Sequence, residues 1–182
     1  MIIAVGCAAG RIAGKLGLPF AAVNTDQEEL DRCQASRKVQ IGLKGMRGLP
    51  ACVPELGAQS ALETRVEIGK LCRGPVVLIA TLGGGTGTGA GPVVVMIAKA
   101  WGCEVTAVVT MPFRFEGQRR NQQAVEGLAR FDVDKLVTVR LDDLLLMLQR
   151  GTSLRKAFEV ADVEVAKIVE RIASKAHVAP AG

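Results

Sequence analysis

The sequence is poor in the side chains that most often act as acid–base catalysts. It contains no tyrosine, and its single histidine, His177, lies close to the C-terminal end, a position where chains commonly fray. We therefore do not expect a catalytic triad built on histidine. The same scarcity disfavours oxidoreductases whose chemistry depends on a catalytic histidine or tyrosine.

Cysteine is present in an odd number and without the spacing of a metal or redox motif. No two of the five cysteines are separated by two residues, as a C-x-x-C motif requires. A disulfide framework and a zinc site are therefore not predicted, and we expect buried or free thiols in a reducing compartment. The five are Cys7, Cys33, Cys52, Cys72 and Cys103.

The charge distribution excludes several kinds of partner. The net charge of +5 is modest and no dense run of lysine and arginine is present, so nucleic-acid binding is not expected. Residues 74–98 carry no formal charge, but seven glycines and two prolines make a lipid-facing helix unfavourable there. The N-terminal residues read as a strand, not as a signal peptide. We therefore expect a cytoplasmic protein without a membrane partner.

Short apolar strand-like runs alternate with helix-like runs along the chain, which is typical of a parallel sheet covered on both faces. We predict a three-layer α/β sandwich with a predominantly parallel, Rossmann-like sheet. Residues 1–177 are expected to form one domain that ends in a long helix from about Thr152 to Ala176, and residues 178–182 a loose tail. The expected strands are Ile2–Val5, Ala21–Val23, Val76–Leu82, Val105–Val109 and Leu136–Val139, and the other helices are Arg11–Leu16, Gln27–Ala35, Leu62–Cys72, Pro92–Trp101 and Gln118–Phe131.

The most informative segment is the glycine-rich run Gly83–Gly89, which lies between an expected strand and an expected helix. Five of its seven residues are glycine and the other two are threonine. Glycine allows positive φ angles and close approach of backbone amides to a ligand. The helix that follows adds unpaired N–H groups and the positive end of its dipole. We interpret this run as a phosphate-binding loop.

The run does not fit either of the two common phosphate motifs. Ala90 and Gly91 stand where the P-loop requires a lysine and a hydroxyl residue. A dinucleotide-binding fingerprint would require an acidic residue at the end of the next strand, but that strand ends in Thr110–Pro112. A Rossmann-type oxidoreductase or nucleotide-sugar enzyme is therefore only a secondary alternative.

The segment Gly83–Gly89 resembles the signature loop of the tubulin/FtsZ superfamily in its FtsZ form. Other segments resemble the family in the same order: Ala21–Asp26, Pro54–Gly57, Ala107–Arg120 and Gly151–Phe158. The resemblance thus extends from the first strand to the last helix. It implies a Rossmann-like domain that binds GTP or GDP, with Mg²⁺ as an accompanying ion. It also implies a role in a prokaryotic cytoskeletal or cell-division filament.

The resemblance assigns roles to particular residues. Thr86, Gly87 and Thr88 correspond to the residues around the phosphates. Glu116 corresponds to the residue at the ribose and Arg120 to the phosphate-facing arginine, although a surface ion pair is an alternative for residues four apart on a helix. Asp162 corresponds to the residue that reads the guanine edge. The full candidate set is Gly6, Gly10, Arg11, Asn24, Asp26, Gly84, Gly85, Thr86, Gly87, Thr88, Gly89, Pro112, Glu116, Arg120 and Asp162; no catalytic residue is assigned and the metal ligands are left open.

Three positions depart from the family pattern. Arg11 stands in place of an asparagine that helps to hold the base, and Leu141 in place of a second one. The segment Leu49–Pro54 lacks the glycines and the asparagine of the loop that senses the γ-phosphate. Strict guanine specificity and γ-phosphate sensing are therefore left open. Arg11 offers a compensating contact, by stacking on the base or meeting a phosphate.

The sequence ends shortly after the expected long helix, so the family's second domain is expected to be absent. In the family, a loop of that domain activates water on the nucleotide of the next subunit. The resemblance therefore implies nucleotide binding with weak or no hydrolysis by this chain alone, and leaves open whether it is an enzyme. A self-sufficient polymerising GTPase is the main alternative. The implied partners are other copies of the chain or a full-length FtsZ-like protein.

Overall fold

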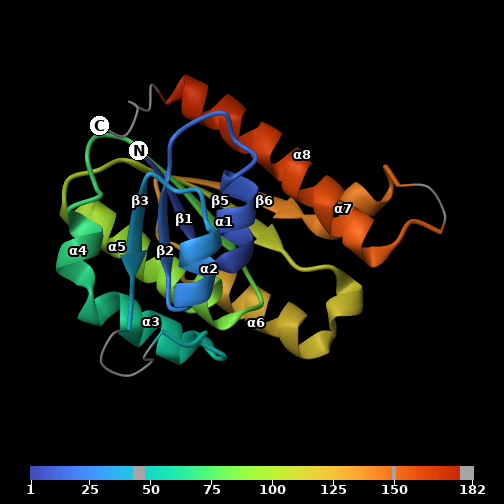
Figure 1. Ribbon diagram of the computed structural model, residues 1–182, viewed down its shortest axis with the longest axis horizontal. Coiled ribbons are helices and arrows are strands. Elements are labelled where there is room, and N and C mark those ends of the chain that lie inside the picture. The colour runs from blue at the N-terminus through green and yellow to red at the C-terminus, as the bar shows by residue number, and fades with distance from the viewer. Residues whose placement is uncertain (43–47, 149–150, 177–182) are drawn as a thin grey trace.

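The computed structural model describes residues 1–42, 48–148 and 151–176. Its centre is a sheet of six strands in which every neighbouring pair is parallel (Figure 1). The strands occur in the order β3-β2-β1-β4-β5-β6. Their bounds are Ile2–Val5 (β1), Ala21–Asn24 (β2), Arg37–Gln40 (β3), Val76–Thr81 (β4), Val105–Met111 (β5) and Lys135–Arg140 (β6). The predicted parallel α/β architecture is therefore confirmed.

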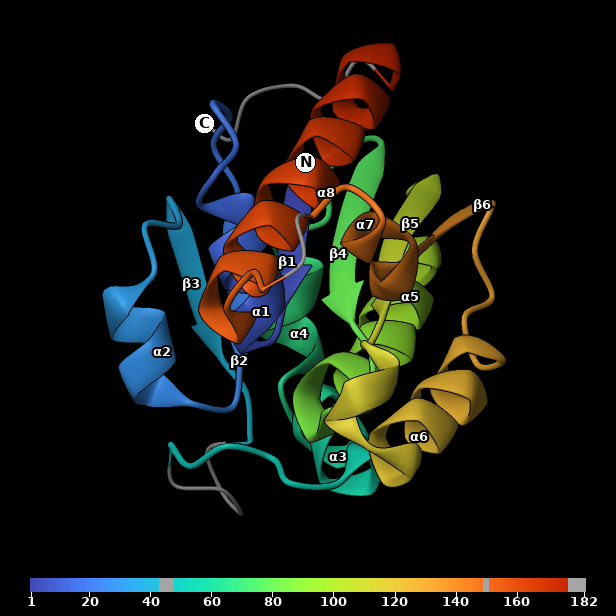
Figure 2. The ribbon, with the colours of Figure 1, turned by 90° about the vertical axis from the view of Figure 1, so that its right-hand side faces the viewer.

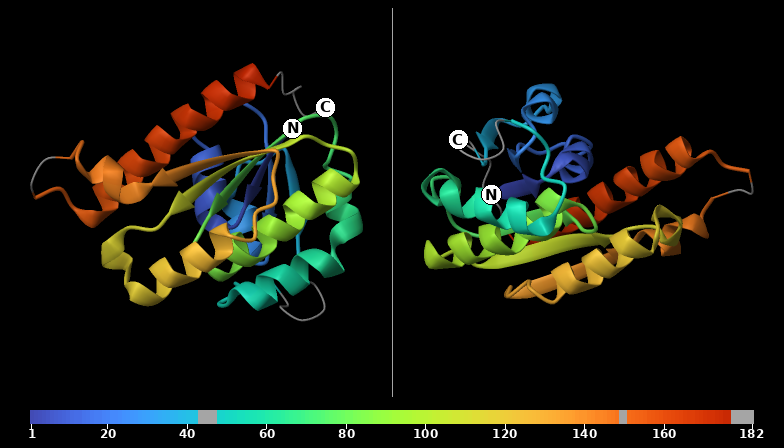
Figure 3. Two further views of the ribbon diagram at one scale, coloured as in Figure 1. Left: turned by 180° about the vertical axis from the view of Figure 1, so that it is seen from behind. Right: turned by 90° about the horizontal axis from the view of Figure 1, so that it is seen from below.

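Helices cover both faces of the sheet and make the other two layers (Figures 2 and 3). Successive residues of a strand point to opposite faces, so both faces of an apolar strand can contribute to a core. One core contains Ile2 of β1 with helices α1, α2 and α8, and the other contains Ile3 of β1 with α3, α4, α5 and α6. The helices are α1 (Cys7–Ala13), α2 (Gln27–Arg32), α3 (Pro54–Glu63), α4 (Arg65–Gly69), α5 (Gly91–Ala100), α6 (Gln118–Leu128), α7 (Leu141–Leu145) and α8 (Leu154–Lys175).

Some predicted element boundaries were wrong. The first helix begins at Cys7, directly after β1, instead of at Arg11. The helix predicted over Leu62–Cys72 is instead the end of α3 followed by the short α4. Strand β3 was missed because its sequence, Arg-Lys-Val-Gln, is mostly polar, which suits the edge of a sheet and carries little hydrophobic signal. The predicted tail 178–182 and His177 lie outside the described residues.

The order of the strands indicates where a ligand site lies on the sheet. The chain leaves β1 toward β2 and leaves β4 toward β5, so the connections diverge between the two neighbouring strands β1 and β4. Parallel sheets bind ligands at such a point, beyond the carboxyl ends of the strands. Val5 of β1 is in register with Ala80 of β4, which places the loops that begin at Gly6 and Leu82 beside each other. No helix in the described ranges is long and apolar enough to cross a bilayer.

Candidate functional site

A cavity of about 1100 Å³ lies at this carboxyl edge of the sheet. It is bounded by the loops after β1, β2, β4 and β5 and by residues of α1 and α8. Twelve of the fifteen residues in the candidate set line it, so the fold brings together segments from five parts of the sequence. These twelve are Gly6, Gly10, Arg11, Asn24, Gly84, Gly85, Thr86, Gly87, Pro112, Glu116, Arg120 and Asp162.

The remaining three candidate residues do not line the cavity and have contacts of their own. The carboxylate of Asp26 accepts a hydrogen bond from the backbone N–H of Glu29 (3.2 Å) and caps α2. The hydroxyl of Thr88 is buried and accepts from the backbone N–H of Gly83 (2.9 Å). Gly89 packs against the backbone of Pro54. Contact of these three residues with a ligand stays a prediction.

The glycine-rich loop continues directly into a helix. Thr86–Ala90 forms a π-helical turn that leads into α5, so the helix begins earlier than the predicted start at Pro92. Within Gly83–Gly89, positive φ occurs at Gly83 alone (97°). Gly85, Gly87 and Gly89 are required by close packing, whereas a Cβ atom at Gly84 would meet nothing closer than 3.9 Å. A Cβ atom added at Gly85 or Gly87 would lie under 3.0 Å from the backbone of a neighbouring segment.

A buried threonine links three of the loops around the cavity. The Thr25 hydroxyl oxygen lies 3.1 Å from the hydroxyl oxygen of Thr86 and accepts a hydrogen bond from the backbone N–H of Ala51 (2.9 Å). Both Thr25 and Thr86 are buried. Thr25 was not in the candidate set, although it lies between two members of it. Its contacts hold the segment around Ala51 against the glycine-rich loop.

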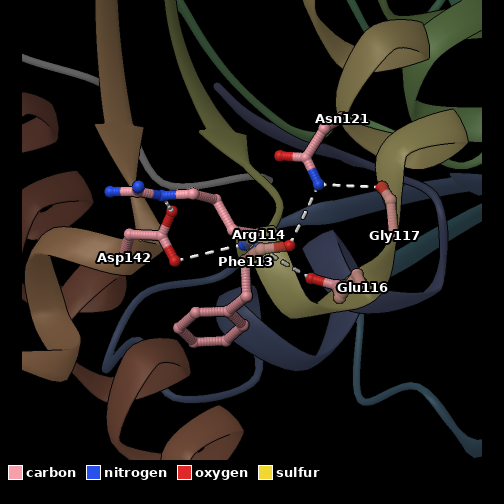
Figure 4. A network of polar contacts seen from close by, with 6 residues as sticks. All are labelled: Phe113, Arg114, Glu116, Gly117, Asn121 and Asp142. Atoms are coloured by element: carbon pink, nitrogen blue, oxygen red, sulfur yellow. Dashed lines mark hydrogen bonds and ion pairs between the residues drawn. The ribbon is translucent and has the colours of Figure 1, made fainter.

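Hydrogen bonds define the turn that follows β5, as Figure 4 shows. Glu116 accepts from the backbone N–H of Phe113 through Oε1 (2.9 Å). Asn121 donates from Nδ2 to the backbone oxygens of Phe113 (3.2 Å) and Gly117 (2.9 Å). Arg114 donates through its backbone N–H and Nε to the two carboxylate oxygens of Asp142, and thereby ties the turn to α7. The orientation of Glu116 is therefore determined before any ligand binds.

Glu116 also forms an ion pair with Arg120. The Arg120 Nη1 atom lies 2.8 Å from Oε2 of Glu116, which is the i,i+4 pair that the sequence left open. The other terminal nitrogen, Nη2, lies beside Gly84, 3.9 Å from the position that a Cβ atom would occupy there. The carboxylate thus holds the guanidinium against the glycine-rich loop. The Glu116–Arg120 ion pair is compatible with both interpretations of Arg120, as one half of a surface ion pair and as an arginine oriented to bind an anion.

Three phenylalanines connect the same turn to α8. The rings of Phe113 and Phe115 are stacked with centroids 4.7 Å apart, and Phe158 of α8 meets Phe113 edge-on at 5.1 Å. Phe113 is fully buried. Since Phe158 is one helical turn from Asp162, this cluster ties the turn that carries Glu116 to the part of α8 that carries Asp162.

Asp162 is nearly buried and pairs with Arg11, whose Nε atom lies 3.2 Å from Oδ2. Burial raises the pKa of the Asp162 carboxyl above its ordinary value, while Arg11 and Lys15 act in the opposite direction. A raised pKa means that this group favours folding most at pH values below the ordinary pKa of an aspartate. That contribution is lost as the pH rises through the folded-state pKa. Ionising this carboxyl in the folded protein therefore carries a cost, which is typical of functional positions.

The cavity contains charged residues that sequence reasoning missed, namely Lys15, Glu29, Arg32, Arg155 and Glu159. Nothing local identified them, because their place depends on how α1, α2 and α8 pack. In the described part of the chain, each carboxylate that lines the cavity contacts an arginine, whereas Lys15 has no carboxylate partner. The pairs are Glu29–Arg32 (3.7 Å), Glu116–Arg120 (2.8 Å), Glu159–Arg155 (3.1 Å) and Asp162–Arg11 (3.2 Å). Over the described ranges, no cluster of three or more His, Cys, Asp or Glu side chains is arranged to hold a metal ion.

Comparison with known proteins identifies a group with the same fold. The family model described as the GTPase domain of the tubulin/FtsZ family matches residues 18–148. An empty FtsZ dimer from M. jannaschii is 35% identical, with a TM-score of 0.86, over 93% of this chain and 53% of that chain. A GTPγS-bound CetZ2 protofilament from Haloferax volcanii is 23% identical, with a TM-score of 0.80, over 98% of this chain and 59% of that chain. The chain thus spans about half the length of these structures. Because the identity to CetZ2 is only 23%, that match shows a shared fold alone.

Proposed function

Because the chain belongs to the tubulin/FtsZ family, we propose that it binds GTP or GDP in the cavity at the carboxyl edge of the sheet. The observation that carries this proposal is the position of the glycine-rich loop. It follows β4 beside the loop that follows β1, at the point where the chain connections diverge, and it leads directly into a helix. We further propose that the protein is a component or a regulator of a prokaryotic cytoskeletal filament in the cytoplasm, with cell division as the process.

The end of the cavity beside the glycine-rich loop suits phosphates. Backbone N–H groups at the start of a helix attract anions, and Gly84, Gly85 and Gly87, which have no side chains, line the cavity there. Arg120 adds a positive charge beside Gly84. A magnesium ion would be held mainly by the phosphates themselves, as is common for this ion.

The other end of the cavity suits a nucleoside. Glu116 has a fixed orientation and can accept hydrogen bonds from ribose hydroxyls. Farther along, Asp162 and Arg11 provide polar groups, whereas Phe158, Ala161 and Val165 provide apolar wall. A mixture of apolar surface and a few oriented polar groups is typical of a pocket for a small organic ligand.

Replacing Arg120 with alanine is expected to weaken GDP binding by about 1.5–3 kcal/mol, which is roughly a 10- to 150-fold increase in Kd. The reason is the loss of a charge-assisted contact with phosphate. Isothermal titration calorimetry with GDP measures the change directly. Arg119→Ala is the matched control, because Arg119 is adjacent in sequence and does not line the cavity. An unchanged Kd in Arg120→Ala would show that Arg120 does not contact the phosphates and only forms a surface ion pair with Glu116.

We propose that the protein assembles through its nucleotide, either with further copies of itself or with a full-length FtsZ-like protein. Two related structures are a dimer of FtsZ and a protofilament of CetZ2, which supports an assembling partner of the same family. Sedimentation with GDP, with GTP and without nucleotide tests self-association. Membership of this family argues against the alternative of a Rossmann-type oxidoreductase.

We expect the 182-residue chain alone to hydrolyse GTP slowly, at no more than roughly 10⁻³ per second, the order of an intrinsic rate without an activating group. Attack on a γ-phosphate requires an oriented water. The carboxylates that line the cavity within the described residues are already paired with arginines, which makes them weaker bases for that task. Phosphate release from GTP measures the rate, alone and with added full-length FtsZ. Faster turnover by the chain alone, abolished in Thr86→Ala, would favour a self-sufficient polymerising GTPase.

A further inference from the structure

Strand β6 forms one border of the sheet and pairs with β5 alone. Figure 2 shows it at that border. An edge strand presents a row of backbone N–H and C=O groups that are not used by the sheet. Most of β6 is also accessible, since four of its six residues are exposed, namely Lys135, Leu136, Thr138 and Arg140. The strand therefore offers hydrogen-bonding backbone along an open border.

The two borders of the sheet differ in how they are protected against further pairing. Proteins commonly protect an edge with a very short strand, charged side chains, proline or a bulge. The opposite border, β3, has only four residues, and two of them, Arg37 and Lys38, are charged. In β6 the charges stand only at the two ends, and Leu136–Val139 contains no charge, proline or glycine. Most of these central residues are β-branched, which favours strand pairing. Strand β6 is therefore the border better suited to accept another strand.

The charges at the two ends of β6 indicate which kind of strand fits. Lys135 and Arg140 are exposed, and over the described part of the chain neither forms an ion pair. The acidic residues nearest to them in sequence, Asp134 and Asp142, accept hydrogen bonds from other groups. Opposite charges that face each other across two strands stabilise the pair. An added strand with an acidic residue at each end would therefore complement β6.

A second copy of β6 complements this border less well. Antiparallel pairing about a twofold axis would place Lys135 of each copy opposite Arg140 of the other. Like charges directly opposite each other destabilise a strand pair. We propose that β6 is a docking edge for an extended, acidic segment of another protein, which joins the sheet as a seventh strand. This inference does not depend on nucleotide binding, because Lys135 and Arg140 lie outside the lining of the cavity.

The probe is a fluorescent peptide of the same length as β6, with blocked ends, glutamate as its first and last residue, and valine and threonine between them. Fluorescence anisotropy at low ionic strength, where exposed charges attract most strongly, measures its Kd. The double variant Lys135→Glu/Arg140→Glu should raise this Kd by about tenfold or more, and it should bind the corresponding peptide that ends in lysines. Lys38→Glu on β3 is the matched control and should leave the Kd unchanged. Thermal unfolding verifies that the variants are folded.

Backbone pairing is tested with two further peptides that keep the side chains but carry N-methyl groups on alternate residues, in the two possible patterns. At least one pattern should bind about tenfold more weakly, because it loses hydrogen-bond donors to β6. Binding of the unmodified peptide should also slow amide hydrogen exchange in β6 and not in β3. Absence of binding up to about 1 mM peptide, or equal binding of all three peptides, would overturn the inference. Slower exchange in β6 on concentrating the chain alone would overturn it too, by assigning the border to a second copy.

Discussion

Replacing Phe113 with alanine is expected to lower the free energy of unfolding by about 3–5 kcal/mol, the usual cost of removing a buried phenylalanine from a core. Phe113 has no exposed surface and contacts both Phe115 and Phe158. Its removal leaves a cavity between the turn after β5 and helix α8. Denaturation by urea, followed by circular dichroism, measures the change.

The matched control for this prediction is Phe115→Ala. Phe115 belongs to the same cluster, but 48% of its surface is exposed, so truncation should cost much less, about 1 kcal/mol. Equal losses in the two variants would show that the cluster does not depend on the buried ring. Because the cluster joins the turn that carries Glu116 to the helix that carries Asp162, we also expect Phe113→Ala to weaken GDP binding.

Introducing a single methyl group at Gly87 is expected to destabilise the protein by about 3 kcal/mol and to abolish GDP binding. In the folded protein, the new Cβ atom of Gly87→Ala would collide with the backbone of Thr81 at the end of β4. Backbone cannot move aside as a flexible side chain can. The loop would therefore shift away from the sheet, and the positions of its N–H groups would change. Thermal unfolding and calorimetry with GDP report the two effects separately.

Gly84→Ala provides the control within the same loop. The nearest atom to a Cβ at Gly84 is Nη2 of Arg120 at 3.9 Å, an ordinary contact distance, and the φ angle of Gly84 is not positive. Its thermal stability should equal that of wild type or slightly exceed it, because alanine restricts the unfolded chain more than glycine does. Equal stability of Gly87→Ala and Gly84→Ala would contradict the close packing described here.

The pairing of carboxylates with arginines around the cavity has an electrostatic consequence. With each lining carboxylate balanced by an arginine among the described residues, Lys15 is left as an uncompensated positive charge. A cavity of this kind favours an anionic ligand. The pairs also orient the carboxylates.

The parts of the fold that were predictable are those with a local signal. Strands β1, β4 and β5 are short runs of apolar residues, because both of their faces are buried. The glycine-rich loop could be recognised from the sequence because five glycines between a strand and a helix are more than a simple turn requires. Strand β3 and the short helix α7 were missed. An edge strand and a five-residue helix bury few side chains, and they leave little periodic pattern in the sequence.

The sequence by itself determined the fold class and the position of the glycine-rich loop, since both follow from nearby residue types and their spacing, while its resemblance to the tubulin/FtsZ family supplied the candidate residues. Only the tertiary structure decided which glycines are required by packing, because Thr81 and Ala51 approach the loop from other segments. The same holds for the pairing of Arg11 with Asp162. Their contact depends on how α1 packs against α8, and no local pattern encodes the meeting of two side chains 151 residues apart.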